Sequence, residues 1–166
     1  PDRLMVVILP DSGSRYLSKF YDNKWMRENG FLEMEFGEVT LGDLLLVKSN
    51  KQLYTASLGD SMRKVMTSMR QNAVSQMPVV GADGALVGTI EEVDLLNHLL
   101  ESHQHSQDEA IDPLVQHAQA VYPPDTSLDE AMPMLTQGFA LIVVDAGKPT
   151  GILTKIDVLD YVAGKI

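Results

Sequence analysis

The sequence predicts an α/β (α+β) fold made of a tandem repeat, in which two strand-helix-strand-strand-helix units pack with pseudo-twofold symmetry. One pattern occurs twice in the 166 residues, in residues 60–99 and again in residues 126–162. In each copy, apolar residues at helical spacing follow a serine, and an apolar run and a closing Gly and Asp come later. Because so short a repeat rarely buries its apolar surface alone, the two copies should pack together. The seam between them is then the natural place for a ligand.

The two copies differ in length by short deletions in their loops. Ser61 and Ser127, which begin the first helix of each copy, are 66 positions apart, whereas Gly88 and Gly151 are 63 apart. Either Asp60 or Ser61 can cap the first of these helices.

Each copy predicts the same elements in the same order. In the first copy we expect a lead-in helix near residues 41–45, a strand at 52–55, a helix with apolar positions 62, 65, 66 and 69, strands at 77–80 and 86–90 joined by an Asp-Gly turn, and a helix at 92–102. In the second copy we expect a lead-in turn at 111–115, a strand at 119–121, a helix at 127–137, strands at 140–144 and 150–153, and a helix at 155–163.

Four segments follow from this organisation. Residues 1–38 have an apolar run at 4–9 and a helical apolar stripe at 16–26, which is too little for a domain and is expected to be the end of a larger one. The repeats are predicted to occupy residues 39–102 and 111–166, with a polar linker at 103–110.

Composition excludes several classes of function. The formal net charge is −10, with 13 Lys and Arg against 23 Asp and Glu, which argues against nucleic acid and anionic membranes as partners. No apolar stretch approaches the roughly 20 residues that cross a bilayer. The absence of cysteine excludes disulfides and thiolate metal sites and agrees with a cytoplasmic protein. No metal site is predicted, because His103 would point away from His98 on a continuous helix, and His103 and His105 fit a polar linker.

The sharpest local motif lies at the start of the last helix. Thr154 leaves a strand and Asp157 follows three residues later. An ionised carboxylate accepts both hydroxyls of a ribose, while Ile152 and Ile156 can enclose a flat base. The alternative is a capping box, in which both side chains only satisfy backbone N–H groups. Both interpretations stay open at this stage.

The repeat motifs identify a family by resemblance. The segments Met77-Pro78-Val79-Val80-Gly81-Ala82-Asp83-Gly84, Gly88…Asp94-Leu95-Leu96 and Gly151…Thr154…Asp157-Val158-Leu159 resemble a pair of CBS domains, known as a Bateman module. The resemblance covers about residues 39–164. It implies that an adenosine-containing ligand binds between the repeats, with the Thr and Asp of the motif on its ribose and substituent. Those roles fall on Thr154 and Asp157.

The leading segment is similar to the end of the catalytic domain of the cystathionine β-synthase family. The similarity rests on residues 7–16, Lys24-Trp25-Met26 and Gly30-Phe31-Leu32. It implies that a pyridoxal-phosphate-dependent lyase of transsulfuration and cysteine biosynthesis, absent here, precedes the CBS pair. Pyridoxal phosphate would belong to that domain alone. This chain is expected to be no enzyme and to hold no cofactor.

The resemblance also implies a ligand and a site. S-adenosylmethionine is the favoured ligand, with AMP or ATP as alternatives. The predicted ligand-binding residues are Gln52, Val74, Gln76, Ile152, Thr154, Ile156 and Asp157. A weaker second site is predicted at Glu91, Asp94 and Phe139, because Glu91 stands where the second copy has Thr154 and would repel phosphate.

Two functions remain in contention. The first is a regulatory module that binds an adenosyl ligand, forms a homodimer through its repeats and controls its own catalytic domain. The second is a structural oligomerisation module without a ligand, in which Thr154 and Asp157 only cap a helix.

Overall fold

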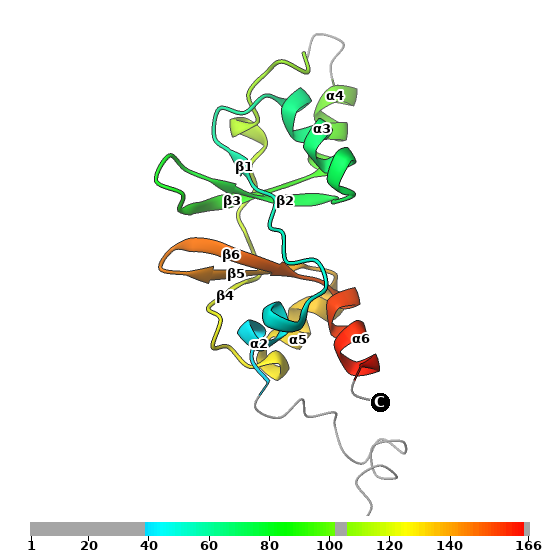
Figure 1. Cartoon of the computed structure of the whole chain (residues 1–166). Coiled ribbons are helices and arrows are strands. Elements are labelled where there is room, and N and C mark those ends of the chain that lie inside the picture. Colours follow the sequence, from blue (N-terminus) through cyan, green and yellow to red (C-terminus); the bar gives the residue numbers. More distant parts are fainter. Residues whose placement is uncertain (1–38, 102–105, 165–166) are drawn as a thin grey trace, which may run out of the picture. The chain divides into compact units, whose positions relative to one another are not determined.

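A computed structural model describes residues 39–101 and 106–164 of the chain. The strand predicted at residues 4–9 and the helix predicted at 16–26 lie outside the described residues. The fold class predicted from the repeat is confirmed, since each copy forms strand, helix, strand, strand and helix (Figure 1). The elements of the first repeat are β1 (Ala56–Ser57), α3 (Met62–Asn72), β2 (Gln76–Val80), β3 (Leu86–Glu91) and α4 (Glu92–Glu101). Those of the second are β4 (Val121–Tyr122), α5 (Leu128–Gln137), β5 (Leu141–Asp145), β6 (Lys148–Leu153) and α6 (Lys155–Ala163).

Each repeat contributes one three-stranded sheet. The strand orders are β1-β2-β3 and β4-β5-β6, with the first pair parallel and the second antiparallel in both sheets. Figure 1 shows the two sheets next to each other, with the helices of each repeat on the outer side of its own sheet. A hydrogen bond of 2.9 Å from the Leu86 N–H to the Gly147 carbonyl joins the two hairpins across this seam.

The helix starts repeat as the sequence predicts. Ser61 accepts a hydrogen bond from the Lys64 N–H, and Ser127 accepts one from the Glu130 N–H, so both serines are N-caps. The β5–β6 hairpin closes through a two-residue turn in which Gly147 has φ 80°, a conformation that glycine adopts without strain.

Both repeats have a buried core on the helix-facing side of the sheet. The first consists of Ala56, Met62, Val65, Met69, Met77, Val79, Ile90, Leu95 and Ile111. Buried residues in the second repeat include Leu128, Ala131, Leu135, Leu141, Val143, Leu153 and Val158. Of the predicted helical core positions, Met66 and Met132 are only half-buried.

The first strand of each repeat starts later than predicted. The strand expected at residues 52–55 lies at Ala56–Ser57, and the one expected at 119–121 lies at Val121–Tyr122. Only two residues of each segment reach a parallel partner, because Ala56 pairs with Val79 and Val121 with Ile142 at the edge of each sheet. The apolar residues before them therefore belong to connecting chain.

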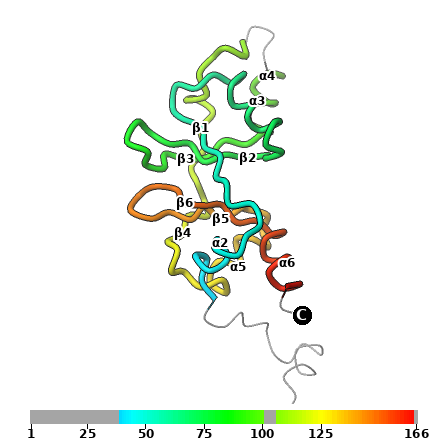
Figure 2. The backbone as a smooth tube through the Cα atoms, viewed as in Figure 1, coloured from blue at the N-terminus to red at the C-terminus, as the bar shows by residue number. Residues whose placement is uncertain are grey.

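The lead-in segments are exchanged between the repeats. Helix α2 (Leu41–Val47) precedes the first repeat in sequence but packs on β6 and α6 of the second. The Leu41 N–H donates to the Thr126 carbonyl at 2.9 Å, and Leu41 and Leu44 are buried. In Figure 2 the chain after α2 crosses to β1 of the other repeat.

The second lead-in makes the reciprocal contact. The 3₁₀ helix η2 (Asp112–Leu114) packs on α4 of the first repeat. The Ile111 N–H donates to the Asp60 carbonyl at 2.9 Å, and Ile111 is fully buried in the first core. The packing therefore differs from the predicted grouping of segments. Each repeat is completed by a segment that comes before the other repeat in the sequence.

Candidate functional site

The Thr154–Asp157 motif forms a tight local structure at the start of α6. Oδ2 of Asp157 accepts hydrogen bonds from the Thr154 N–H at 2.7 Å and from the Thr154 hydroxyl at 2.8 Å. Thr154 is the N-cap of the helix, and Asp157 occupies its third position. The capping interaction that the sequence left open is therefore present, and it commits one carboxylate oxygen of Asp157.

A lysine from the exchanged helix also binds this motif. Nζ of Lys48 donates to the Ile152 carbonyl at 2.8 Å and to Oδ2 of Asp157 at 3.1 Å. The side chains of Lys48 and Asp157 are only 15% and 13% exposed, so water screens this ion pair less than it screens a surface pair. Lys48 is the C-cap of α2, and the packing of α2 on the second repeat brings it here.

The first repeat has the same motif without the lysine. Oδ2 of Asp94 accepts from the Glu91 N–H at 3.0 Å, which matches the bond between Thr154 and Asp157. Glu91 supplies no hydroxyl. Within residues 39–101 and 106–164, neither Glu91 nor Asp94 belongs to an ion pair.

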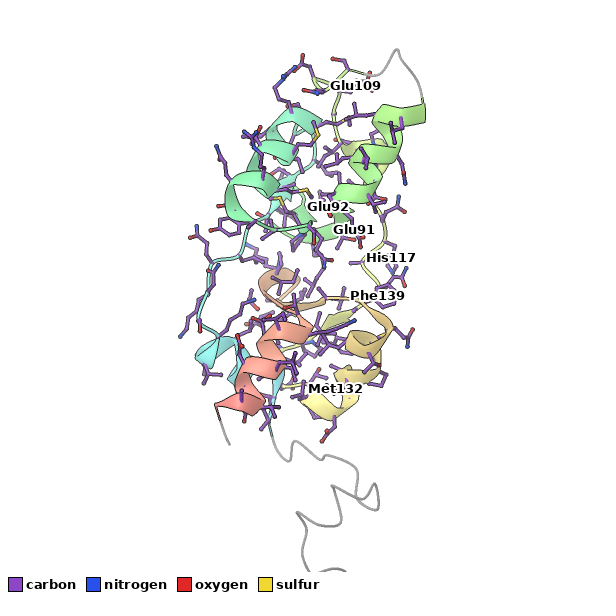
Figure 3. All side chains as sticks on the ribbon, turned by 90° about the vertical axis from the view of Figure 1, so that its right-hand side faces the viewer. Glu91, Glu92, Glu109, His117, Met132 and Phe139 are labelled. Carbon is purple, nitrogen blue, oxygen red and sulfur yellow. The ribbon has the colours of Figure 1, made fainter. Side chains whose placement is uncertain are left out.

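An open hollow of about 520 Å³ lies against this acidic motif. Its first-repeat wall includes Gln76, Thr89, Glu91 and Asp94, and its second wall includes Gln116, His117, Gln119 and Phe139. Figure 3 shows Glu91 on the first-repeat side of the seam, Phe139 on the second-repeat side and His117 between them. The volume falls within the roughly 300–1,000 Å³ of small-molecule sites.

Backbone pairing fixes the wall where Gln116, near the start of the second repeat, meets β3. The Thr89 N–H donates to the Gln116 carbonyl at 2.9 Å, and the Gln116 N–H donates to the Thr89 carbonyl at 2.8 Å. Gly88 lies beside this bridge, and a Cβ there would stand 2.3 Å from the Gln116 oxygen. The position therefore requires glycine.

The structure distributes the seven predicted ligand residues over five hollows, and Gln76 lines two of them, including the open hollow. Gln52 and Ile152 line one of about 220 Å³, whereas Gln76, Thr154 and Ile156 line one of about 200 Å³. The others lie apart from both: Asp157 faces a hollow of about 310 Å³ between α2 and α6, and Val74 lines an apolar groove between α3 and α4.

The three residues predicted for the weaker site do share one hollow. Glu91, Asp94 and Phe139 all line the open hollow of about 520 Å³. Phe139 also lines the hollow next to Thr154, so this aromatic ring borders both the open hollow and the smaller one. Val74 and Phe139 are structural equivalents, because each donates its N–H to a carbonyl five residues earlier, at Met69 and Met134.

Sequence reasoning missed Lys48, Gln116 and His117. Lys48 belongs by sequence to the first repeat, and only the exchange of α2 brings it to the second. His117 and Gln116 lie in a segment without an apolar pattern. Their distance from Gly88 in sequence gives no sign that they face β3.

The described part of the chain has neither a cluster of metal-binding side chains nor a membrane-spanning helix. There, no group of three or more His, Cys, Asp or Glu side chains is placed to hold a metal ion. No helix in the same residues has both the length and the apolar character needed to cross a membrane.

Comparison with known proteins gives consistent findings. The CBS domain family profile matches residues 41–101 and 115–164. Cystathionine β-synthase of Mus musculus is 28% identical over 96% of this chain, which spans 34% of the length of that protein. Among solved structures, CBSX2 in complex with AMP has a TM-score of 0.62 at 28% identity and covers 76% of this chain and 97% of its own.

A more distant structure has the same fold. A CBS domain-containing protein of unknown function from Bacillus anthracis has a TM-score of 0.67 at 18% identity and covers 79% of this chain and 97% of its own.

Proposed function

Because the chain belongs to the CBS domain family, we propose that it is a regulatory module that binds a small adenosyl ligand in the seam between its repeats. The observation that carries this proposal is the open hollow of about 520 Å³. Polar residues of both repeats line it, together with Phe139 of the second repeat. The AMP complex of CBSX2, a relative in fold and sequence, supports an adenosine-containing ligand. The affinity of a ligand that contacts both repeats depends on how the two repeats are arranged.

The controlled partner is proposed to be a catalytic domain of the same protein. The chain is similar to cystathionine β-synthases but spans about a third of their length. We infer a parent lyase of that kind in the cytoplasm, with pyridoxal phosphate held outside the CBS pair. Residues 1–38 are the proposed end of that domain, and the pair itself carries out no catalysis.

Charge favours S-adenosylmethionine over nucleotides in the open hollow. Glu91 and Asp94 line it and have no cationic partner among residues 39–101 and 106–164. A phosphate beside two carboxylates is repelled, whereas a sulfonium group is attracted. The ligand regulates only to the extent that its affinity differs between two arrangements of the module, a coupling of typically about 1–3 kcal/mol.

A homodimer through α4 and α6 completes the proposal. Val93 and Leu96 on α4 are 47% and 56% exposed, and the residues 63 positions later on α6, Ile156 and Leu159, are 63% and 62% exposed. Exposed apolar residues at equivalent places in both repeats make a self-complementary surface. Sedimentation equilibrium is expected to give the mass of two chains, and a single-chain mass would refute the dimer.

A thermal-shift titration separates this function from a ligand-free scaffold. S-adenosylmethionine at 100 times its Kd is expected to stabilise the fold by about 2.7 kcal/mol, or roughly 5–10 °C in melting temperature. ATP should give a smaller shift, and free methionine none. No shift with any adenosyl compound near 1 mM, in a chain that melts cooperatively, would favour the scaffold.

A pair of variants tests the charge preference. Glu91→Thr removes a carboxylate that lines the hollow. It should reduce the difference between the melting-temperature shifts that S-adenosylmethionine and ATP produce. Glu92→Thr is the matched control, because the neighbouring Glu92 lines the apolar groove instead. Equal effects of the two substitutions would contradict the proposed ligand chemistry.

A further inference from the structure

We propose that Lys48 holds one of two equivalent half-sites closed, so that the chain binds its adenosyl ligand beside Asp94 and not beside Asp157. This inference rests on the proposed function and adds the regulation of its site. It reverses the order expected from the sequence, in which the Thr154–Asp157 half-site is the better one.

The two half-sites are built alike in their backbone. Asp94 and Asp157 are 63 positions apart, and each accepts the N–H of the residue three positions earlier, at 3.0 Å and 2.7 Å. Each lies at the start of a helix that follows the last strand of its sheet. Any difference in ligand access therefore comes from what surrounds the two carboxylates.

The surroundings differ at one carbonyl of the preceding strand. Thr89 and Ile152 are equivalent, also 63 positions apart. The Thr89 carbonyl accepts the backbone N–H of Gln116 at 2.8 Å, whereas the Ile152 carbonyl accepts Nζ of Lys48 at 2.8 Å. In the first repeat a backbone group satisfies the carbonyl. In the second a cationic side chain satisfies it and also reaches the carboxylate.

Lys48 therefore competes directly with a ribose. Oδ2 of Asp157 already accepts three hydrogen bonds, from the Thr154 N–H, the Thr154 hydroxyl and Lys48. The two Thr154 bonds alone fill the roughly two lone pairs of this oxygen, so a ligand hydroxyl would have to bind Oδ1, on a carboxylate whose charge Lys48 already pairs. The equivalent Oδ2 of Asp94 accepts one, from the Glu91 N–H.

The space beside the two half-sites also favours binding next to Asp94. The Asp94 side has one continuous hollow of about 520 Å³. Around the Thr154–Asp157 motif the space is divided into hollows of about 220, 200 and 310 Å³, and Lys48 lines two of them. Its side chain thus stands between the hollow beside Asp157 and the one beside Ile152.

The exchange of α2 makes this lysine a regulatory contact. Lys48 ends the helix that is docked on the second repeat, and the chain then crosses to β1 of the first. Displacement of Lys48 would free the end of α2 and the connector that follows it. Occupation of the Asp157 half-site is thereby coupled to the link between the repeats.

Calorimetric stoichiometry with S-adenosylmethionine tests the inference on the 166-residue chain. The unaltered chain is expected to bind one ligand per chain, and Lys48→Met, which keeps most of the aliphatic stem, to bind two. Lys64→Met, a change of an exposed lysine on α3 that lines none of these hollows, should leave one. The double variant Lys48→Met/Asp94→Asn should also bind one, now beside Asp157.

Two substitutions with Lys48 in place keep the test decisive if Lys48→Met fails to fold. Asp94→Asn should weaken binding at least tenfold, whereas Asp157→Asn should change it less than twofold. The inference is overturned if Lys48→Met still binds one ligand, or if Asp157→Asn weakens binding and Asp94→Asn does not. Absence of binding in every chain would instead refute the proposed function, and this inference with it.

Discussion

Replacing Leu44 by alanine is expected to lower the free energy of unfolding by about 2–4 kcal/mol. Leu44 is 1% exposed and lies on α2, which packs on β6 and α6. Truncation leaves a cavity in the second repeat, although the residue precedes the first repeat in sequence. Urea unfolding followed by circular dichroism measures the loss.

Leu46→Ala provides the matched control, because Leu46 lies on the same helix but is 70% exposed. Its effect should stay within about 0.5 kcal/mol. Each repeat is completed by a segment that precedes the other, so the two repeats should unfold together. Leu44→Ala should therefore lower the urea midpoint of a single cooperative transition. A biphasic curve with an unchanged second transition would show that the lead-in helices are not exchanged.

Substitution of Gly88 by alanine is expected to destabilise the chain by about 3 kcal/mol. The new Cβ would lie 2.3 Å from the Gln116 carbonyl oxygen and 2.7 Å from Cγ1 of Val115. Relief requires a backbone shift, which strains the packing and breaks the two Thr89–Gln116 hydrogen bonds. Because Thr89 and Gln116 line the open hollow, ligand binding should weaken as well.

The equivalent change in the second repeat is an informative comparison. At Gly151 a Cβ would stand 2.5 Å from a methyl carbon of Leu45, which is a side chain and can move. Gly151→Ala should therefore cost only about 1 kcal/mol. Equal unfolding free energies for the Gly88→Ala and Gly151→Ala variants, measured in urea, would contradict the close approach of Val115 and Gln116 to β3.

Most of the fold follows from local sequence. Ser61 and Ser127 mark the helix starts, and the helix predicted at residues 155–163 matches α6. These features depend on interactions within a few residues, namely caps, turns and apolar spacing. Strands β1 and β4 begin later than the sequence predicts. Their bounds depend on where the partner strand lies and not on their own residues.

The exchange of the lead-in segments has no local signal. The apolar positions Leu41 and Leu44 show that α2 buries one face, but the same stripe fits either repeat. For that reason the sequence places Lys48 in the first repeat and gives no sign of its contact with Asp157. The residues of the open hollow were found only in part, because Gln116 and His117 reach the seam through tertiary packing.

The central claim is that an adenosyl ligand occupies the seam and touches both repeats. The most direct test is a titration of the isotopically labelled chain with S-adenosylmethionine, followed through its two-dimensional amide spectrum. We expect saturable shifts at Glu91 and Asp94 of the first repeat together with Phe139 and Ala140 of the second, all of which line the open hollow. The absence of saturable shifts, or shifts confined to one repeat, would contradict the claim.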